Sequence, residues 1–260
     1  MKINIHAGHS AIGGGSPGAI GILSESVENR KVRNVLIKLL KANGDTVYDC
    51  TVDKGTSSSV LVGIVKLCNA HKVDLDISLH FNAGANKIAN GATTGVETLI
   101  YSAGSGNGYA KTIAQKIANE IAKLGFKNRG VKVRPELYVL KNTNAPAILV
   151  ECCFVDDPDD AKIYDATKMA QAIFKGITGK DAPKESNSGS GNSSTTTSSN
   201  KVKIIVDKLN VRTGPGVTYK TNGAVNKGEV FTIVEKKKSW GKLKSGAGWI
   251  NNSSKYVKEV

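Results

Sequence analysis

Two histidines and a glutamate, His9, His80 and Glu25, occupy positions from which they could share one zinc ion. His9 follows the apolar segment 3–5, and His80 ends the apolar segment 75–79. Glu25 begins a segment whose apolar residues recur with helical spacing. Two imidazoles and one carboxylate leave the fourth tetrahedral position open, which is the arrangement of catalytic zinc sites. These residue types therefore point to a metal-dependent hydrolase.

Spacing alone does not decide which glutamate belongs to this set. Glu28 lies one turn further along the same helical segment and could face the same way. Glu25 also follows Ser24, a candidate N-cap, so its charge could simply complement the helix dipole. The residue pattern therefore leaves the ligand role and the dipole role of Glu25 equally open.

A further carboxylate, Glu151, ends the uninterrupted apolar run 147–150. Such a run predicts a buried strand that delivers its last side chain to the edge of a sheet. There Glu151 could accept a proton from water and pass it to a leaving amine. His6 lies an odd number of residues before His9, so in an extended segment it should point to the other side and support the site only indirectly.

Residues 13–18 match the pattern G-x-G-x-x-G of dinucleotide-binding proteins. That pattern needs a strand, the glycines and a helix in direct succession, whereas here Pro17 intervenes and the helix starts only near Ser24. We therefore interpret the glycines as a mobile loop beside the metal, which gives a polymeric substrate room to enter.

Strand-like and helix-like segments alternate over the first 180 residues. Helical spacing of apolar residues recurs in the stretches 32–40, 113–124 and 173–177. Further strands are expected at 46–50, 75–79, 96–101 and 147–151. This alternation predicts an α/β fold with a mostly parallel sheet flanked by helices on both faces. Ligands of such sheets collect at the carboxyl ends of the strands, where His9, His80 and Glu151 fall.

The composition changes after residue 180. Residues 181–200 have the Gly, Ser, Asn and Thr content of a flexible linker. Residues 201–260 contain brief β-like runs separated by glycine-rich turns, which is typical of a small all-β barrel. We therefore predict a catalytic domain over residues 1–180, a linker over 181–200 and a binding domain over 201–260. In that last domain Trp249 is expected in the core, and the role of Trp240 is open.

Charge and apolar content limit the partners and the compartment. The net charge is +14, and residues 201–260 alone carry 13 basic and 4 acidic side chains, a surface suited to nucleic acid, an acidic membrane or an anionic cell wall. No apolar run is long enough to span a bilayer, and the N-terminus lacks the pattern of a signal peptide, so we expect synthesis in the cytoplasm.

Four cysteines are expected as buried, reduced thiols: Cys50, Cys68, Cys152 and Cys153.

Four sequence blocks resemble the signatures of zinc-dependent N-acetylmuramoyl-L-alanine amidases of the phage-lysin and sporulation type. The blocks are AGHS at 7–10, SE at 24–25, SLHFNA at 78–83 and LVECCF at 149–154. The resemblance covers residues 1–180 and implies His9, Glu25 and His80 as zinc ligands and Glu151 as the catalytic carboxylate, which favours Glu25 over Glu28. The chain departs from the family at His6, where relatives commonly have aspartate, and at GHS, where they have a GHGG-like block.

The C-terminal residues are similar to bacterial Src-homology-3-like domains that target wall hydrolases to peptidoglycan. The similar blocks are LNVRTGPG at 209–216, GEVFTIVE at 228–235 and WGKLKSGAGWI at 240–250. Together the two halves resemble a phage or prophage endolysin, which is made in the host cytoplasm and acts on the cell wall after release. The resemblance implies peptidoglycan as the partner, with no nucleic acid and no insertion into a membrane. Two alternatives remain: a zinc peptidase that cuts the stem peptide, and a wall-binding protein that holds no metal.

Overall fold

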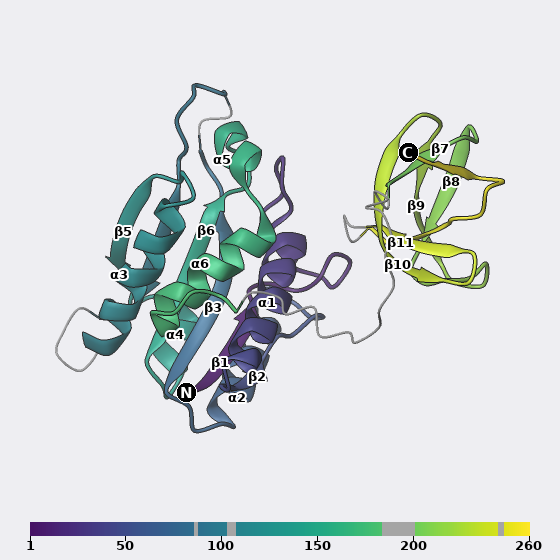
Figure 1. The fold of residues 1–260 in the computed structure, drawn as a ribbon. Coiled ribbons are helices and arrows are strands. Elements are labelled where there is room, and N and C mark those ends of the chain that lie inside the picture. Colours follow the sequence, from purple (N-terminus) through teal and green to yellow (C-terminus); the bar gives the residue numbers. More distant parts are fainter. Residues whose placement is uncertain (86–87, 103–107, 184–200, 244–246) are drawn as a thin grey trace. The chain divides into compact units, whose positions relative to one another are not determined.

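The computed structural model of the chain describes residues 1–85, 88–102, 108–183, 201–243 and 247–260. The chain divides into two compact units, Met1–Asn187 and Ser188–Val260 (Figure 1). Each unit has its own hydrophobic core. Most of the predicted linker, residues 184–200, lies outside the described residues. Within the described segments, no helix has both the length and the apolar character needed to cross a membrane.

A six-stranded sheet forms the centre of the first unit. Its strands are β1 (Lys2–Ala7), β2 (Thr46–Asp49), β3 (Leu75–Asn82), β4 (Val96–Ile100), β5 (Asn128–Val133) and β6 (Ala147–Phe154). They lie in the order β2-β1-β3-β6-β4-β5. Every neighbouring pair is parallel except β4 and β6, which are antiparallel. The predicted mostly parallel sheet is therefore confirmed.

Helices cover both faces of this sheet, as predicted. Helices α1 (Glu25–Ala42), α3 (Gly108–Ala122) and α6 (Ala166–Thr178) pack together on one face (Figure 1). Helices α2 (Ser57–Asn69) and α4 (Tyr138–Asn142) pack on the opposite face in a second apolar cluster. Strand β6 contributes side chains to both clusters, and this explains why residues 147–150 are continuously apolar. Strand β3 has an alternating sequence and contributes its apolar side chains to the first cluster.

Three short elements could not be predicted from the periodicity of apolar residues. Strand β5 reads NRGVKV and contains no apolar run, because it lies at the edge of the sheet. Helix α4 has five residues, and α5 (Pro158–Ile163) has six, which is too short for helical periodicity to be recognised. The turn before α5 is set by Asp157, whose side chain accepts hydrogen bonds from the backbone N–H groups of Asp159 and Asp160.

The strand order gathers the carboxyl ends of β1, β3 and β6 at one edge of the sheet. Strand β3 lies between β1 and β6, so the chain segments that follow these strands are neighbours. His80 in β3 is directly opposite Glu151 in β6, and Leu79 is opposite Ala7, the last residue of β1. His9 follows two residues after β1. The sheet thus places the predicted site residues together, although they are up to 142 positions apart in the chain.

A buried carboxyl group, Asp76, lies at the opposite end of β3. Nδ2 of Asn4 donates a hydrogen bond to its Oδ1 at 2.6 Å, whereas Oδ2 is buried and has no hydrogen-bond partner among the described residues. Burial raises the pKa of Asp76 to about 6, against the opposing effect of the Asn4 hydrogen bond. An acid whose pKa is higher in the folded state than in the unfolded state binds its proton more tightly when folded. The protein therefore loses stability as the pH rises from about 4 to about 6.

Replacing Asp76 with asparagine is expected to remove this loss. The free energy of unfolding should rise by up to about 3 kcal/mol at pH 8 and change little at pH 4, where the native carboxyl group is already protonated. Urea unfolding at the two pH values measures the difference. The exposed Asp74→Asn variant, which keeps an acceptor for the Lys2 amide, is the matched control. Equal effects of Asp76→Asn at both pH values would contradict the prediction.

The second unit is an antiparallel β structure. Its strands are β7 (Lys201–Ile204), β8 (Lys208–Arg212), β9 (Thr221–Asn226), β10 (Val230–Lys237), β11 (Trp240–Leu243), β12 (Trp249–Asn251) and β13 (Val257–Glu259). They lie in the order β13-β7-β10-β11-β12-β8-β9. Trp249 is buried, as predicted, with the Nζ atoms of Lys237 and Lys242 over its ring, and Trp240 is buried as well. The four cysteines of the first unit are free and buried, which confirms that expectation.

Candidate metal centre

The backbone turns sharply where β1 ends. His9 has a φ of 60°, in the left-handed region that residues with a Cβ atom rarely adopt. Gly8 before it has no room for a side chain, because a Cβ atom there would overlap the ring of His80. The turn therefore brings the first imidazole beside the second, and the two ring centroids are 5.0 Å apart.

Glu25, the first residue of α1, lies between the two histidines. Its Oε1 is 2.9 Å from Nδ1 of His80, and its Oε2 is 3.4 Å from Nε2 of His9. Two backbone N–H groups hold the carboxylate in place: Phe81 donates to Oε1 at 3.1 Å and Ala19 donates to Oε2 at 2.8 Å. The carboxylate is thus oriented before any ion binds.

Glu28, the alternative left open by the sequence pattern, has another role. Its carboxylate accepts a hydrogen bond from Nζ of Lys31 at 2.8 Å, one turn along the helix. The ligand atoms of His9, Glu25 and His80 lie within 4.8 Å of one another, and among the described residues they are the group that could hold a metal ion. The geometry therefore brings Glu25, rather than Glu28, together with the two histidines.

Electrostatic interactions within this group favour a charged glutamate. Burial raises the pKa of Glu25, but the hydrogen bond with His80 and the charges of both histidines outweigh burial and hold that pKa below its usual range. Burial lowers the pKa of His9, and the neighbouring His80 lowers it further. His9 therefore favours the neutral form, which is the form that binds metals.

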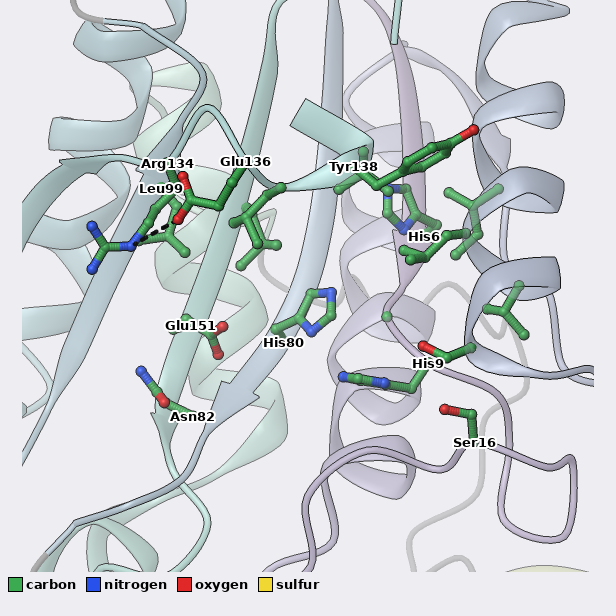
Figure 2. Close-up of a pocket in the computed structure, with 18 of the residues that line it drawn as sticks. His6, His9, Ser16, His80, Asn82, Leu99, Arg134, Glu136, Tyr138 and Glu151 are labelled. Carbon is green, nitrogen blue, oxygen red and sulfur yellow. Dashed lines mark ion pairs between the residues drawn. The ribbon is translucent and has the colours of Figure 1, made fainter. Parts of the chain in front are cut away.

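Glu151 projects into the same cavity as His80 (Figure 2). Its Oε2 is buried and has no hydrogen-bond partner among the described residues. Burial raises its pKa to about 7; the charge of His80 opposes this shift, whereas the nearby carboxylates of Glu25 and Glu97 reinforce it. A carboxyl group with this pKa can take up and release a proton near neutral pH.

The cavity around these groups has a volume of about 610 Å³. One wall is polar and carries the histidines and Glu151, while Arg134 and Glu136 lie at another part of the lining (Figure 2). Helices α2 and α4 and the adjoining strands supply the apolar lining, which includes Val60, Leu61, Ile64, Leu99, Val139 and Leu149. Ser16, from the glycine-rich segment, also reaches the cavity, so that loop lies beside the site as predicted.

The prediction that His6 points away from the site is wrong. His6 lines the same cavity as His9, and its Nδ1 lies 3.5 Å from Oγ of Ser78. The alternation of strand side chains ends at Ala7, and the left-handed turn at His9 redirects the chain, so the odd spacing carries no information here. Burial and the charge of His80 lower the pKa of His6 to about 3, and the ring is therefore neutral.

Two residues of α1 near the site were missed by the sequence reasoning. Asn29, fully buried, and Arg30 both donate hydrogen bonds to the backbone of the Gly8–His9 turn. A signal for Asn29 exists in the sequence: it occupies a core-facing position of the helix, in the same buried stripe as Val32 and Leu36. A polar side chain at such a position needs a partner inside the fold.

The donor set fits a zinc ion. Zinc takes imidazole nitrogen and carboxylate oxygen ligands at about 2.0–2.2 Å, and catalytic sites use three protein ligands. Ligand atoms within 4.8 Å of one another can close around such an ion with small side-chain movements. The unpartnered oxygen of Glu151 on the neighbouring strand leaves one carboxyl group free for proton transfer.

Comparison with known proteins identifies the families of both units. The N-acetylmuramoyl-L-alanine amidase family matches residues 3–179, and the bacterial SH3 domain family matches residues 207–258. An uncharacterized protein of Clostridium perfringens strain 13 is 32% identical over 242 residues, which are 90% of this chain and 69% of that protein. The endolysin of Bacillus phage SPP1 is 30% identical over 278 residues, which are 97% of this chain and 96% of the endolysin.

A solved structure supports the fold. The catalytic domain of the CD27L endolysin, which targets Clostridia Difficile, superimposes with a TM-score of 0.61 and 28% identity. The superposition covers 70% of this chain and 98% of that domain. The chain therefore belongs to the N-acetylmuramoyl-L-alanine amidase family and carries a bacterial SH3 domain after its amidase domain.

Proposed function

We propose that this protein is a zinc-dependent N-acetylmuramoyl-L-alanine amidase of the endolysin type, which hydrolyses the amide bond between N-acetylmuramic acid and L-alanine in peptidoglycan. The family match and the similarity to a phage endolysin along nearly the whole chain support the activity. The observation that carries the zinc dependence is the convergence of His9, Glu25 and His80, with ligand atoms within 4.8 Å, beside the buried Glu151.

His9, Glu25 and His80 would hold the ion. A zinc ion in such a site supplies a Lewis acid that polarises the scissile carbonyl group and lowers the pKa of water. Glu25 is fixed by two backbone N–H groups, so it contributes its negative charge in a defined orientation. The neutral His6 adds no positive charge to the cavity wall.

Glu151 moves the proton. Its unpartnered Oε2 accepts a proton from the attacking water and then delivers it to the nitrogen of the departing alanine. A pKa near 7 suits both steps, because the group must gain the proton and lose it in each cycle. The apolar wall from α2 and α4 keeps bulk water away from one side of the reacting bond.

The C-terminal unit is proposed to bind the cell wall. Residues 201–260 carry 13 basic and 4 acidic side chains, which suits an anionic wall polymer. Attachment of the second unit to the wall raises the effective concentration of the catalytic unit at its insoluble substrate, without any new catalytic contact. As in other enzymes of the endolysin type, the protein would act on the wall after its release from the cell in which it is made.

End-group analysis of digested peptidoglycan tests the proposed bond. Purified walls are incubated with the protein, and the newly exposed amino groups are labelled and identified. We expect alanine to be the new amino-terminal residue, released in proportion to the loss of turbidity. New amino termini other than this alanine would identify a peptidase of the stem peptide, and binding to walls without any new termini would identify a non-catalytic wall-binding protein.

A further inference from the structure

The backbone conformation of His9 is unfavourable and must be maintained by other groups. Its φ of 60° lies in the left-handed region, which among non-glycine residues of the described chain only Lys238 shares. A residue in this region relaxes to an extended or right-handed conformation unless its surroundings hold it. Rotation of the backbone at His9 would swing the imidazole away from Glu25 and His80.

Two neighbouring carbonyl groups define the conformation of His9. The peptide plane before its Cα carries the carbonyl oxygen of Gly8, and the plane after it carries the oxygen of His9 itself. Nδ2 of Asn29 donates to the Gly8 oxygen at 2.9 Å, and Nη1 of Arg30 donates to the same oxygen at 3.5 Å. Nη2 of Arg30 donates to the His9 oxygen at 3.0 Å. With both planes anchored, neither φ nor ψ of His9 can change freely.

The groups that hold these carbonyls have further contacts of their own within the fold. Asn29 is fully buried in α1, one helical turn after Glu25. Arg30 is fixed on its other side by Asp53, whose Oδ1 lies 3.0 Å from Nε and 2.9 Å from Nη2. The backbone of Asp53 accepts a hydrogen bond from Ala11 at 3.0 Å, so this contact also anchors the chain just after His9.

We propose that Asn29 and Arg30 form a clamp that positions His9 for metal binding; this inference rests on the proposed zinc site. Helix α1 then serves the site twice. It supplies Glu25 as a direct ligand, and through the clamp it holds the backbone of a second ligand in its left-handed turn. Groups that orient a metal ligand in this way typically contribute a factor of about 10 to 100 in metal affinity.

Zinc affinity of Arg30→Ala, measured by competition with a chromophoric chelator, tests the clamp. We expect the affinity to fall about 10- to 100-fold. The matched control is Arg33→Ala, because Arg33 lies on the same helix, its side chain is 13% exposed against 14% for Arg30, and it pairs with Asp49 at 3.6 Å without touching the metal site. Arg33→Ala should bind zinc within about twofold of the unaltered protein, well below the change expected for a clamp residue.

A double-mutant cycle separates positioning from a general loss of structure. In the His9→Ala background the clamp has no ligand to position, so adding Arg30→Ala should not weaken zinc binding further. Asn29→Asp, which keeps the side-chain size but replaces the donor with an acceptor, should weaken zinc binding as Arg30→Ala does. Asp53→Asn weakens the ion pair that holds Arg30 and leaves α1 unchanged, so it provides a second variant if Arg30→Ala unfolds. The zinc affinity of Asp53→Asn should also fall, but by less than that of Arg30→Ala.

Three outcomes decide the matter. The clamp proposal is wrong if Arg30→Ala binds zinc as tightly as Arg33→Ala does. It is also wrong if Arg30→Ala lowers the zinc affinity as much in the His9→Ala background as in the native background. If the unaltered protein binds no zinc under the same conditions, the proposed metal site itself fails. Far-ultraviolet circular dichroism and the melting temperature of each metal-free variant verify that the compared proteins are folded.

Discussion

Replacing Glu151 with glutamine is expected to slow wall hydrolysis by a factor of about 10² to 10⁴, the usual contribution of a general acid–base group. Glutamine has nearly the same size but cannot exchange a proton, so the step that transfers the proton to the departing amine loses its carrier. Glu151 is not among the three converging side chains proposed to hold zinc, and zinc content should therefore stay the same. The rate is measured as the loss of turbidity of purified walls, together with the release of amino-terminal alanine.

Glu136→Gln is the matched control for this experiment. Glu136 lines the same cavity, but its side chain is 65% exposed and its partner is Arg134 rather than a residue of the metal site. We expect this variant to clear walls at a rate close to that of the unaltered protein. Full activity of Glu151→Gln, with zinc still bound, would remove Glu151 from the mechanism.

The second large effect is expected for Glu25→Gln, which should leave the protein without zinc after dialysis. The substitution removes the negative charge from one of the three proposed ligands, so the loss of zinc affinity should exceed the factor of about 10 to 100 typical of a supporting contact. Wall hydrolysis should fall to the background rate, as it should when the unaltered protein is treated with a chelator. Metal analysis of the dialysed protein measures the zinc content directly.

Glu28→Gln provides an unusually close comparison. Both glutamates are buried in the first turn of α1, but Glu28 pairs with Lys31 and lies outside the converging group. The Glu28 variant should retain one zinc ion per chain and most of its activity. If zinc is lost from Glu28→Gln and retained by Glu25→Gln, the assignment from the geometry is reversed.

Helix periodicity shows why this choice was open before the structure was known. Residues three apart on a helix lie on nearly the same side, so Glu25 and Glu28 are equivalent in the pattern. The fold distinguishes them through contacts from distant segments: the N–H of Phe81 in β3 and the N–H of Ala19 in the preceding loop both donate to Glu25. The family resemblance gave the same answer, but the residue pattern alone could not.

The expectation for His6 failed for a related reason. Strand alternation is a local rule, and it applies only while the backbone stays extended. Gly8 and the left-handed His9 end the extended segment. The residue types of AGHS at 7–10 do not predict that the histidine adopts a positive φ. That conformation depends on Asn29 and Arg30, which belong to another element of the fold.

Three things could be predicted from the amino-acid sequence alone: the main strands and helices, the boundary between a mixed α/β part and an all-β part, and the residue types that can hold zinc. These follow from local periodicity and composition, which act over a few residues. Four features depend on the folded chain: the order of the strands, the position of His6 in the cavity lining, the clamp on His9 and the raised pKa of Glu151. Each of these arises from contacts between segments far apart in the chain, and burial and electrostatic fields are sums over such contacts.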